Sequence, residues 1–391
     1  LEHLKQLKHQ WEGYYDKLVV AMPAMSREEY EQQKSSLVNF SQGQQEIYLR
    51  ELCPDHKNYS LLFILKNLLP TLKRINEFVK HSQLLHSGLS TRVFFPTSFI
   101  AVIIALIRRK KVVYVVDIDF RESALMSYKN QDFSLKSYLL CKYIYDPLRV
   151  LQIEIAARFC HLVLLKGQKM AQDFDQGKDN VKYFLDAAHN EEQIISTTQL
   201  NHKNSILKEE GILDLVYFGR LVPYKGLSYC LHAIAQLSSQ EHQKLRFNII
   251  GSGYQKEELI SLATELNIMD QVIFHDFIPY GRLLFEKLYT YHLLLACPLR
   301  QDTPRSALDA MAAGMGIVAF DTYYYRELTS SGAVKVIPWL STEKLAEEIH
   351  YLNQNREHII KMTSSAVNFA RQNTQTIWLN KRINWTLEKT K

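Results

Sequence analysis

The chain has 391 residues, of which 47% are hydrophobic and 23% are charged, and these are the values of a globular protein with room for two cores. The net charge of +6 is spread over both halves, which argues against a nucleic-acid-binding module. It is compatible with an anionic small ligand or an anionic membrane surface. The five cysteines are scattered without a CxxC pair, which argues against a disulfide framework or a zinc site and suits a cytoplasmic protein.

The longest apolar run extends from Phe99 to Ile107 and is too short to cross a bilayer, so we interpret it as a buried helix. Any contact with the inner face of a membrane is therefore expected to be peripheral. The chain opens without Met, inside a pattern typical of a helix, so we expect a further segment upstream of Leu1.

Short β-branched or aromatic runs alternate with longer stretches of helical spacing, and this alternation predicts a doubly wound α/β fold. The runs predict strands at Leu18–Ala21, Val112–Val116, Leu162–Leu165, Leu215–Phe218, Phe247–Ile250, Val272–Phe274, Leu293–Ala296, Gly316–Ala319 and Val334–Ile337. The stretches predict helices at Leu227–Leu237, Gln255–Leu266, Ala307–Ala313 and Thr342–Asn353. The pattern is clear after residue 210 and blurred before it.

The polar stretch His189–Glu210 is the expected linker between two domains. The tail after Arg356 has no strand-like run and predicts helices to the end of the chain. Trp378 and Trp385 stand seven residues apart, on one face of the last predicted helix.

Two glycine-containing loops follow predicted strands in the second half. In the first, Gly219 ends a strand and is followed by Arg220 and Lys225, which could grip a diphosphate at the carboxyl end of the sheet. In the second, Gly251 and Gly253 predict a tight turn or a close approach to a ligand. The alternatives are a surface loop that happens to contain two cations and an ordinary turn.

Two further loops follow later strands. The first carries His275, where a lone histidine is more often structural, although the backbone beside it could read a base edge. In the second, Thr303 is the predicted N-cap and Pro304 the first turn of a helix, so the backbone N–H groups of residues 303–306, which include Arg305 and Ser306, would bind an anion without a metal. Asp309 lies further into this helix, within reach of the ligand, unless it is simply solvated.

These four loops follow one another in a fixed order, and in this residues 212–340 resemble the carboxy-terminal domain of the retaining GT-B glycosyltransferases of family 4, the group 1 transferases. The family pattern is visible as G-R-L-x-x-x-K-G, I-x-G-x-G, F-x-G-x-x-P and a Glu-x7-Glu box before A-M-A-x-G. Asp276 stands where the third motif has glycine. Pro304 sets the register of the box, so Gln301 and Asp309 stand where the family has its two glutamates. By resemblance, Gln301 contacts hydroxyls of the donor sugar and Asp309 the ribose hydroxyls.

In the first half, the run from Lys111 ends in Asp117 and Asp119, followed by Arg121. Many family members have a cleft histidine after the corresponding strand, and Asp117 holds that place. Asp117 or Asp119 is therefore expected to contact a sugar, with Arg121 pairing one of them, and the alternative is a salt bridge at the end of a strand. The segment with Asp186 and His189 resembles a short polar stretch that the family presents to the cleft. The glycine-rich turn that usually follows the first strand is not visible in residues 1–200.

The resemblance implies a GT-B architecture, in which two Rossmann-like doubly wound domains face each other across a cleft. We expect an acceptor-side domain at residues 1–200, a donor-binding domain at 201–372 and a last helix at 373–391 that returns to the first domain. The implied reaction moves a hexose from a nucleoside diphosphate sugar to a hydroxyl acceptor with retention, with neither a metal nor a cofactor beyond the donor. The alternative is a GT-B pseudo-enzyme that acts as a binding subunit.

Overall fold

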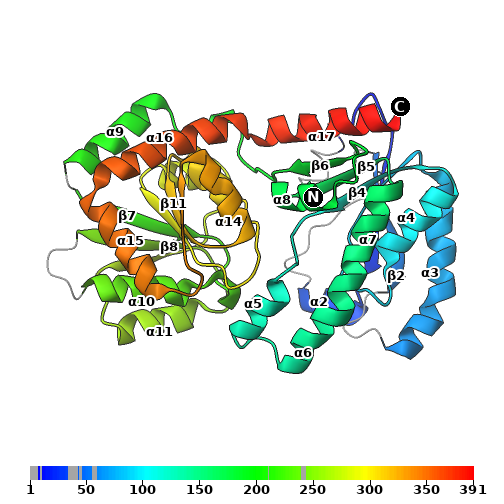
Figure 1. Ribbon diagram of the computed structural model, residues 1–391, viewed down its shortest axis with the longest axis horizontal. Helices are drawn as coiled ribbons and strands as arrows, with labels where there is room; N and C mark the ends of the chain where they lie inside the picture. Colours follow the sequence, from blue (N-terminus) through cyan, green and yellow to red (C-terminus); the bar gives the residue numbers. More distant parts are fainter. Residues whose placement is uncertain are drawn as a thin grey trace.

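Two parallel sheets, each at the centre of its own α/β domain, organise the chain (Figure 1). The protein was analysed as a computed structural model, which describes residues 8, 11–33, 43, 46–54, 60–209, 211–238 and 244–391. Within this described part, none of the helices combines the length and the apolar character that a bilayer crossing requires.

The first domain is built on a four-stranded sheet in the order β3-β4-β5-β6. Its strands are Leu84–Gly88, Lys111–Val116, Leu162–Lys166 and Val181–Phe184. The helices around it are α3 (Leu61–His81), α4 (Thr97–Ile107), α5 (Ser123–Lys129), α6 (Leu135–Leu140), α7 (Asp146–Phe159) and α8 (Gln168–Phe174). A π-helical turn at Cys141–Tyr145 joins α6 to α7. The buried strands β4 and β5 are the continuous apolar runs that the sequence predicts.

The predicted strand at Leu18–Ala21 does not belong to this sheet. It lies in β1 (Leu18–Ala24), which pairs in parallel only with β2 (Ile47–Pro54) among the described strands. A short helix, α2 (Arg27–Gln33), follows β1. The first domain therefore carries a separate two-stranded unit ahead of its main sheet.

The second domain has a six-stranded parallel sheet in the order β12-β11-β10-β7-β8-β9. The strands are β7 (Leu213–Phe218), β8 (Leu245–Ile250), β9 (Val272–His275), β10 (Leu293–Ala296), β11 (Gly316–Phe320) and β12 (Val334–Ile337). The chain builds outward in one direction from β7 and then in the other from β10. The switch point between β7 and β10 is where loops diverge and where such sheets bind ligands.

Helices cover both faces of this sheet, as the strand–helix alternation predicts. They are α10 (Leu227–Ser238), α11 (Lys256–Glu265), α12 (Arg282–Leu288), α13 (Ser306–Ala312), α14 (Tyr323–Leu328), α15 (Thr342–Gln354) and α16 (Arg356–Gln372). Each predicted strand and helix after residue 210 corresponds to one of these elements.

The stretch expected to be a weakly structured linker is mostly helical, because it contains helix α9 (Thr197–Lys208). Ser196 and Gln199 form a capping box at its start, which satisfies two backbone donors and stabilises the helix end. Lys203 is buried, and its ammonium donates to the carbonyls of Ala313 and Gly314 at 2.8 and 3.0 Å. Helix α9 is thereby joined to the end of α13 and packs with α16 as part of the second domain.

The last helix, α17 (Gln375–Thr390), crosses from the second domain to the first (Figure 1). Its Trp378 is buried, packs edge-on against Tyr183 of β6, and lies 6.5 Å from the ring of Trp385. At its far end, the Lys389 ammonium pairs with Asp179 at 3.0 Å. This helix closes one face of the first sheet with residues that lie nearly 200 positions later in the chain.

We expect Trp378→Ala to lower the free energy of unfolding of the first domain by about 3–5 kcal/mol, because it removes a large buried ring and leaves a cavity. Hydrogen exchange should then become faster in β4, β5 and β6 and stay unchanged in β10 and β11. Tyr254→Ala, at an exposed ring in the second domain, is the matched control and should change little. Faster exchange confined to the second sheet would contradict the assignment.

Candidate functional site

The loops after β7 and β10 flank an open hollow at the switch point of the second sheet. These loops are residues 219–226 and 297–305. The hollow has a volume of about 290 Å³ and is lined by Tyr217, Lys225, Leu294, Leu295, Ala296, Cys297, Pro298, Asp302, Pro304, Ser306 and Tyr325. Two of the four segments singled out in the sequence therefore meet at one concave site, as expected of loops that diverge at a switch point.

The three glycines of the predicted ligand loops lie where the loops after β7 and β8 touch each other. The Leu221 N–H donates to the Ser252 carbonyl at 2.9 Å. A Cβ atom on Gly251 would lie 1.9 Å from the Gly219 carbonyl oxygen, and one on Gly253 would lie 2.1 Å from the Leu221 carbonyl oxygen. The close approach that glycine permits here is therefore between two backbones, and it fixes the position of the loop with Arg220.

The two cations of the first loop have different surroundings. The Arg220 guanidinium is exposed and donates to the Tyr224 hydroxyl at 2.7 Å. The Lys225 ammonium forms an ion pair with the Asp302 carboxylate. Because Asp302 belongs to the loop after β10, Lys225 ties together the two loops that flank the hollow.

The predicted helix start at Thr303 is wrong. Helix α13 begins at Ser306 with Arg305 as its N-cap, and no side chain caps it. The physical reason is that the Asp302 carboxylate accepts a hydrogen bond from the Thr303 N–H at 3.0 Å and holds Thr303 and Pro304 in the loop. The N–H groups of Arg305 and Ser306 donate to no acceptor among the described residues, so they remain available to an anion.

Asp309 is buried in α13 and is not the solvated residue of the alternative interpretation. Its carboxylate accepts a hydrogen bond from the Tyr280 hydroxyl at 3.5 Å and lies 3.7 Å from Nδ1 of His189. Burial raises the pKa of Asp309. His189 is itself buried, and its Nε2 lies 3.1 Å from the Ala370 carbonyl oxygen at the end of α16. His189 therefore connects α13 with α16.

His275 lies at the end of β9, an edge strand of the second sheet. Its Nε2 lies 2.9 Å from the Asn248 side-chain oxygen and donates to it, because an amide oxygen can only accept. Burial lowers the pKa of this imidazole. Asp276, the residue that departs from the family pattern, is exposed and pairs with Lys256 at 2.9 Å.

A second open hollow, of about 300 Å³, lies between the two domains. It is lined by Asp119, Lys166, Gly167 and Met170 from the first domain and by Gln301, Thr303, Tyr323, Tyr324 and Glu327 from the second. Two of the three predicted catalytic residues, Asp119 and Gln301, therefore line one space, although they are far apart in the sequence.

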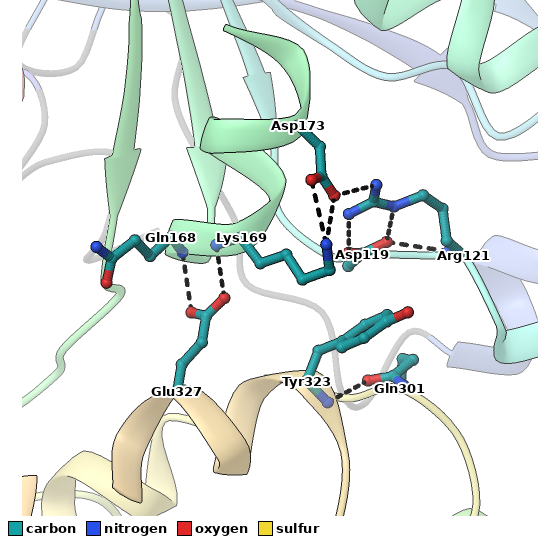
Figure 2. A network of polar contacts seen from close by, with 8 residues as sticks. All are labelled: Asp119, Arg121, Gln168, Lys169, Asp173, Gln301, Tyr323 and Glu327. Carbon is teal, nitrogen blue, oxygen red and sulfur yellow. Dashed lines mark hydrogen bonds and ion pairs between the residues drawn. The ribbon is translucent and has the colours of Figure 1, made fainter. Parts of the chain in front are cut away.

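Asp119 forms a salt bridge with Arg121, which both interpretations of the sequence allow (Figure 2). Its carboxylate accepts from Nε and Nη2 of Arg121 at 2.8 and 2.6 Å, and Arg121 also donates to Asp173 at 2.7 Å. Lys169 pairs with the same Asp173 at 3.1 Å. Asp117 differs from Asp119: its side chain is exposed, and no described residue forms a hydrogen bond with its carboxylate.

Gln301 is buried between the domains. Its side-chain oxygen accepts from the Tyr323 N–H at 3.1 Å, and its side-chain nitrogen lies 3.6 Å from the Met126 sulfur of the first domain. Because sulfur is a weak acceptor, the amide N–H₂ keeps most of its capacity to donate to another oxygen.

Two interdomain contacts were not predicted from the sequence. The Glu327 carboxylate of α14 accepts from the backbone N–H groups of Gln168 and Lys169 at 2.9 and 2.8 Å, at the start of α8 (Figure 2). The Lys166 ammonium donates to the Thr303 carbonyl at 3.2 Å and lies 3.5 Å from Asp186. Lys166 directly follows the predicted strand Leu162–Leu165, which is a weak sequence signal; Glu327 has none.

Comparisons with known proteins agree with this geometry. Residues 198–372, somewhat less than half of the chain, match the sequence model of the family described as "Glycosyl transferases group 1". An uncharacterized glycosyltransferase of Haemophilus influenzae is 32% identical over 128 residues, which are 33% of this chain and 35% of that protein. One of Methanocaldococcus jannaschii is 26% identical over 155 residues, or 39% of each protein. The chain thus spans little more than a third of the length of these relatives.

Solved structures match nearly the whole chain. Anabaena HepE in complex with UDP has a TM-score of 0.67 at 16% identity, over 98% of this chain and 94% of that one. Sucrose-phosphate synthase from Thermosynechococcus elongatus has a TM-score of 0.66 at 12% identity, over 99% and 92%. WaaG, a glycosyltransferase of lipopolysaccharide biosynthesis, has a TM-score of 0.59 at 14% identity, over 87% and 86%. The chain has the GT-B fold, and its second domain carries the group 1 glycosyltransferase pattern.

We expect Glu327→Ala to speed up hydrogen exchange at the amides of Gln168 and Lys169 by at least about tenfold, because each loses a charge-assisted hydrogen bond. Small-angle scattering of the same variant should give a larger radius of gyration if the contact holds the domains together. Glu347→Ala, at an exposed ion pair on α15, is the control and should change neither measurement. Unchanged exchange at both amides would show that the contact does not persist in solution.

Proposed function

We propose that the protein is a glycosyltransferase that moves a hexose from a nucleoside diphosphate sugar to a hydroxyl acceptor with retention of anomeric configuration. The observation that carries this proposal is the hollow at the switch point of the second sheet, with Lys225 and the free amides of Arg305 and Ser306 around it. The family model that matches residues 198–372 supports the same activity. The resemblance to family 4 is the reason for proposing a retaining mechanism.

The diphosphate would lie between the loop after β7 and the start of α13. Arg220 is exposed and has one neutral hydroxyl partner, so it can turn toward phosphate oxygens without breaking an ion pair. Lys225 would exchange its Asp302 partner for a phosphate, or share its charge with both. The amides of Arg305 and Ser306 would add two donors. Together these groups would stabilise the charge that develops on the leaving nucleoside diphosphate.

The remaining donor contacts follow from the resemblance. Asp309 would accept hydrogen bonds from the ribose hydroxyls, and the Gln301 side-chain N–H₂ would donate to a hydroxyl of the transferred sugar. The close backbone approach at Gly219, Gly251 and Gly253 would keep the loop with Arg220 in position beside the donor. The backbone beside His275 would form hydrogen bonds with the edge of the base. Gln301 retains this donor because its oxygen, not its nitrogen, is used by the Tyr323 N–H.

The acceptor would approach from the first domain. Asp117 is exposed at the end of β4, and its carboxylate could accept a hydrogen bond from the attacking hydroxyl. Asp119 would act indirectly, since its carboxylate is engaged by Arg121 and shapes the hollow. The departing diphosphate would help to remove the proton, so the protein's part is positioning and charge stabilisation.

A peripheral contact with an anionic membrane surface belongs to the same proposal. Helix α6 and the π-helical turn after it contain no buried residue, although Leu135, Leu139 and Tyr143 are apolar or aromatic. Lys136 and Lys142 supply positive charge on the same segment. Leucine, tyrosine and lysine in this combination suit the interface of a bilayer.

We expect the protein to release nucleotide from at least one member of a panel of UDP-, GDP- and ADP-hexoses, and we expect Arg220→Ala to weaken nucleotide binding about tenfold or more. UDP is the first nucleotide to test, because HepE has the same fold and was crystallised with it. Titration calorimetry gives the binding constants. Arg282→Ala, at an exposed ion pair on α12, is the matched control.

No release from any donor, combined with no nucleotide binding, would favour the pseudo-enzyme alternative or overturn the placement of the donor site. Nucleotide binding that Arg220→Ala leaves unchanged would remove this residue from the diphosphate site.

We further propose that no divalent metal takes part, and we expect initial rates to persist in excess EDTA. Arg220, Lys225 and two backbone amides would offset the two to three negative charges of a nucleoside diphosphate, so a cation would be redundant. The protein should first be shown to be free of metal by atomic absorption. Activity that is lost with EDTA and restored by Mg²⁺ or Mn²⁺ would move the donor site toward Asp117 and Asp119.

A further inference from the structure

Helix α17 covers a part of the first sheet that carries polar side chains, among them His86 and Lys166. Strand pairing aligns His86 with Val113, and Lys166 with Phe184. Because side chains alternate along each strand, His86, Val113 and Val115 fall on one face, and Asp117 directly follows the end of β4. The buried Val113, Val115 and Phe184 on this face pack in one cluster with Trp378 of α17. Asp117, Lys166 and Phe184 lie at or just after the carboxyl ends of their strands. Helix α17 therefore passes over the edge of the sheet that faces the second domain, where Lys166 lines the interdomain hollow.

Arg382 is the side chain that α17 contributes at this edge. Its guanidinium lies over the ring of Phe184, 4.8 Å from the ring centre. It is half-buried, and burial lowers its pKa, whereas the nearby carboxylates of Asp186 and Asp117 raise it. Asp186 and Asp117 are thus within electrostatic reach of Arg382, but neither forms an ion pair with it.

Three other cations near this edge have hydrogen-bond acceptors. Arg121 has Asp119 and Asp173, Lys166 has the Thr303 carbonyl, and Arg305 donates to Asp186 at 3.0 Å. The Arg382 guanidinium donates to no described residue, although it has five N–H donors. None of its nitrogens is buried without a partner, so they are accessible to water and to a ligand. A half-buried arginine with accessible, unused donors is therefore suited to bind a ligand.

The charges around Arg382 indicate what that ligand carries. Asp186 is already neutralised, because both Lys166 and Arg305 contact it. Asp117 has a free carboxylate, which accepts hydrogen bonds and repels anions. A ligand that satisfies both Arg382 and Asp117 has an oxyanion at one position and a hydroxyl at another. Arginine binds carboxylates and phosphates through paired hydrogen bonds, and both groups meet this requirement.

We propose that Arg382 binds an acidic group, a carboxylate or a phosphate, of the hydroxyl acceptor and thereby makes the enzyme select acidic acceptors. The inference rests on the proposed function, since it assigns the acceptor side of the same cleft. Phe184 supplies the flat support for the guanidinium, and Asp117 faces the hydroxyl that attacks. Helix α17 thus has a second role beyond covering the first sheet: it delivers the residue that selects the acceptor.

The test compares three small probes on the 391-residue protein saturated with UDP: methyl glucuronide, glycerol 1-phosphate and neutral methyl glucoside. Calorimetry should show that the wild type binds at least one acidic probe more tightly than the glucoside. R382Q should weaken binding of that acidic probe by about tenfold or more and leave the glucoside unaffected. The first two probes distinguish a carboxylate from a phosphate.

K381Q is the matched control. Lys381 directly precedes Arg382 on α17, but its ammonium lies over the ring of Trp378 instead of Phe184. It should leave the preference for the acidic probe unchanged. If R382Q does not fold, as judged by thermal melting, R382K replaces it: this variant should keep the preference with weaker affinity. Equal affinities of R382K for acidic and neutral probes would overturn the proposal.

The proposal is also overturned if neither acidic probe binds better than the glucoside, if R382Q binds both as the wild type does, or if K381Q weakens binding as much as R382Q. UDP binding is measured on the same samples. Intact UDP binding without a preference for acids removes this inference and leaves the proposed function standing. If the wild type binds none of UDP, GDP and ADP, the proposed function itself is removed.

Discussion

The carboxylate of Glu327 on the first two amides of α8 joins the two domains at the edge of the hollow between them. Both hydrogen bonds are charge-assisted, and the carboxylate belongs to one domain while the amides belong to the other. Gly167, with φ of 114°, precedes the helix and gives the carboxylate room, since a Cβ atom there would lie 3.3 Å from its oxygen. The contacts of Lys166 with Thr303 and of Gln301 with Met126 depend on the same alignment. The carboxyl edges of the two sheets therefore enclose the hollow between the domains.

Around the two hollows, some charged side chains form ion pairs that a ligand would leave intact, and others form ion pairs that a ligand would have to break. The Asp119–Arg121–Asp173 network is complete and, with Lys169 on the same Asp173, has no net formal charge, so it stiffens one wall of the hollow. The pair of Lys225 and Asp302 is a different case, because under the proposed function an incoming diphosphate would compete with the carboxylate for the same ammonium. Such competition would reduce the affinity for the donor. After the product leaves, Asp302 would again pair with the lysine.

The sequence predicts the second domain better than the first for a physical reason. Buried parallel strands are continuous apolar runs, and these stand out after residue 210, whereas β3 contains His86 and Ser87 and gives no such signal. The helix start at Thr303 was misplaced because a side chain, Asp302, takes the first amide. Glu327 and Arg382 could not be predicted, since their roles arise only when α14 and α17 meet the first domain. Local patterns carry no information about such long-range contacts.

The path of α17 also has a consequence for how the protein is made. The face of the first sheet with Val113, Val115, Leu162 and Leu164 is complete long before Trp378 emerges from the ribosome. At synthesis rates of about 5–20 residues per second, roughly 200 further residues take about 10–40 s. During this interval the nascent first domain lacks the helix that covers this apolar surface in the folded protein. The folding of the first domain is therefore completed last, although its sequence comes first, and until then that face is a surface that a chaperone of nascent chains can bind.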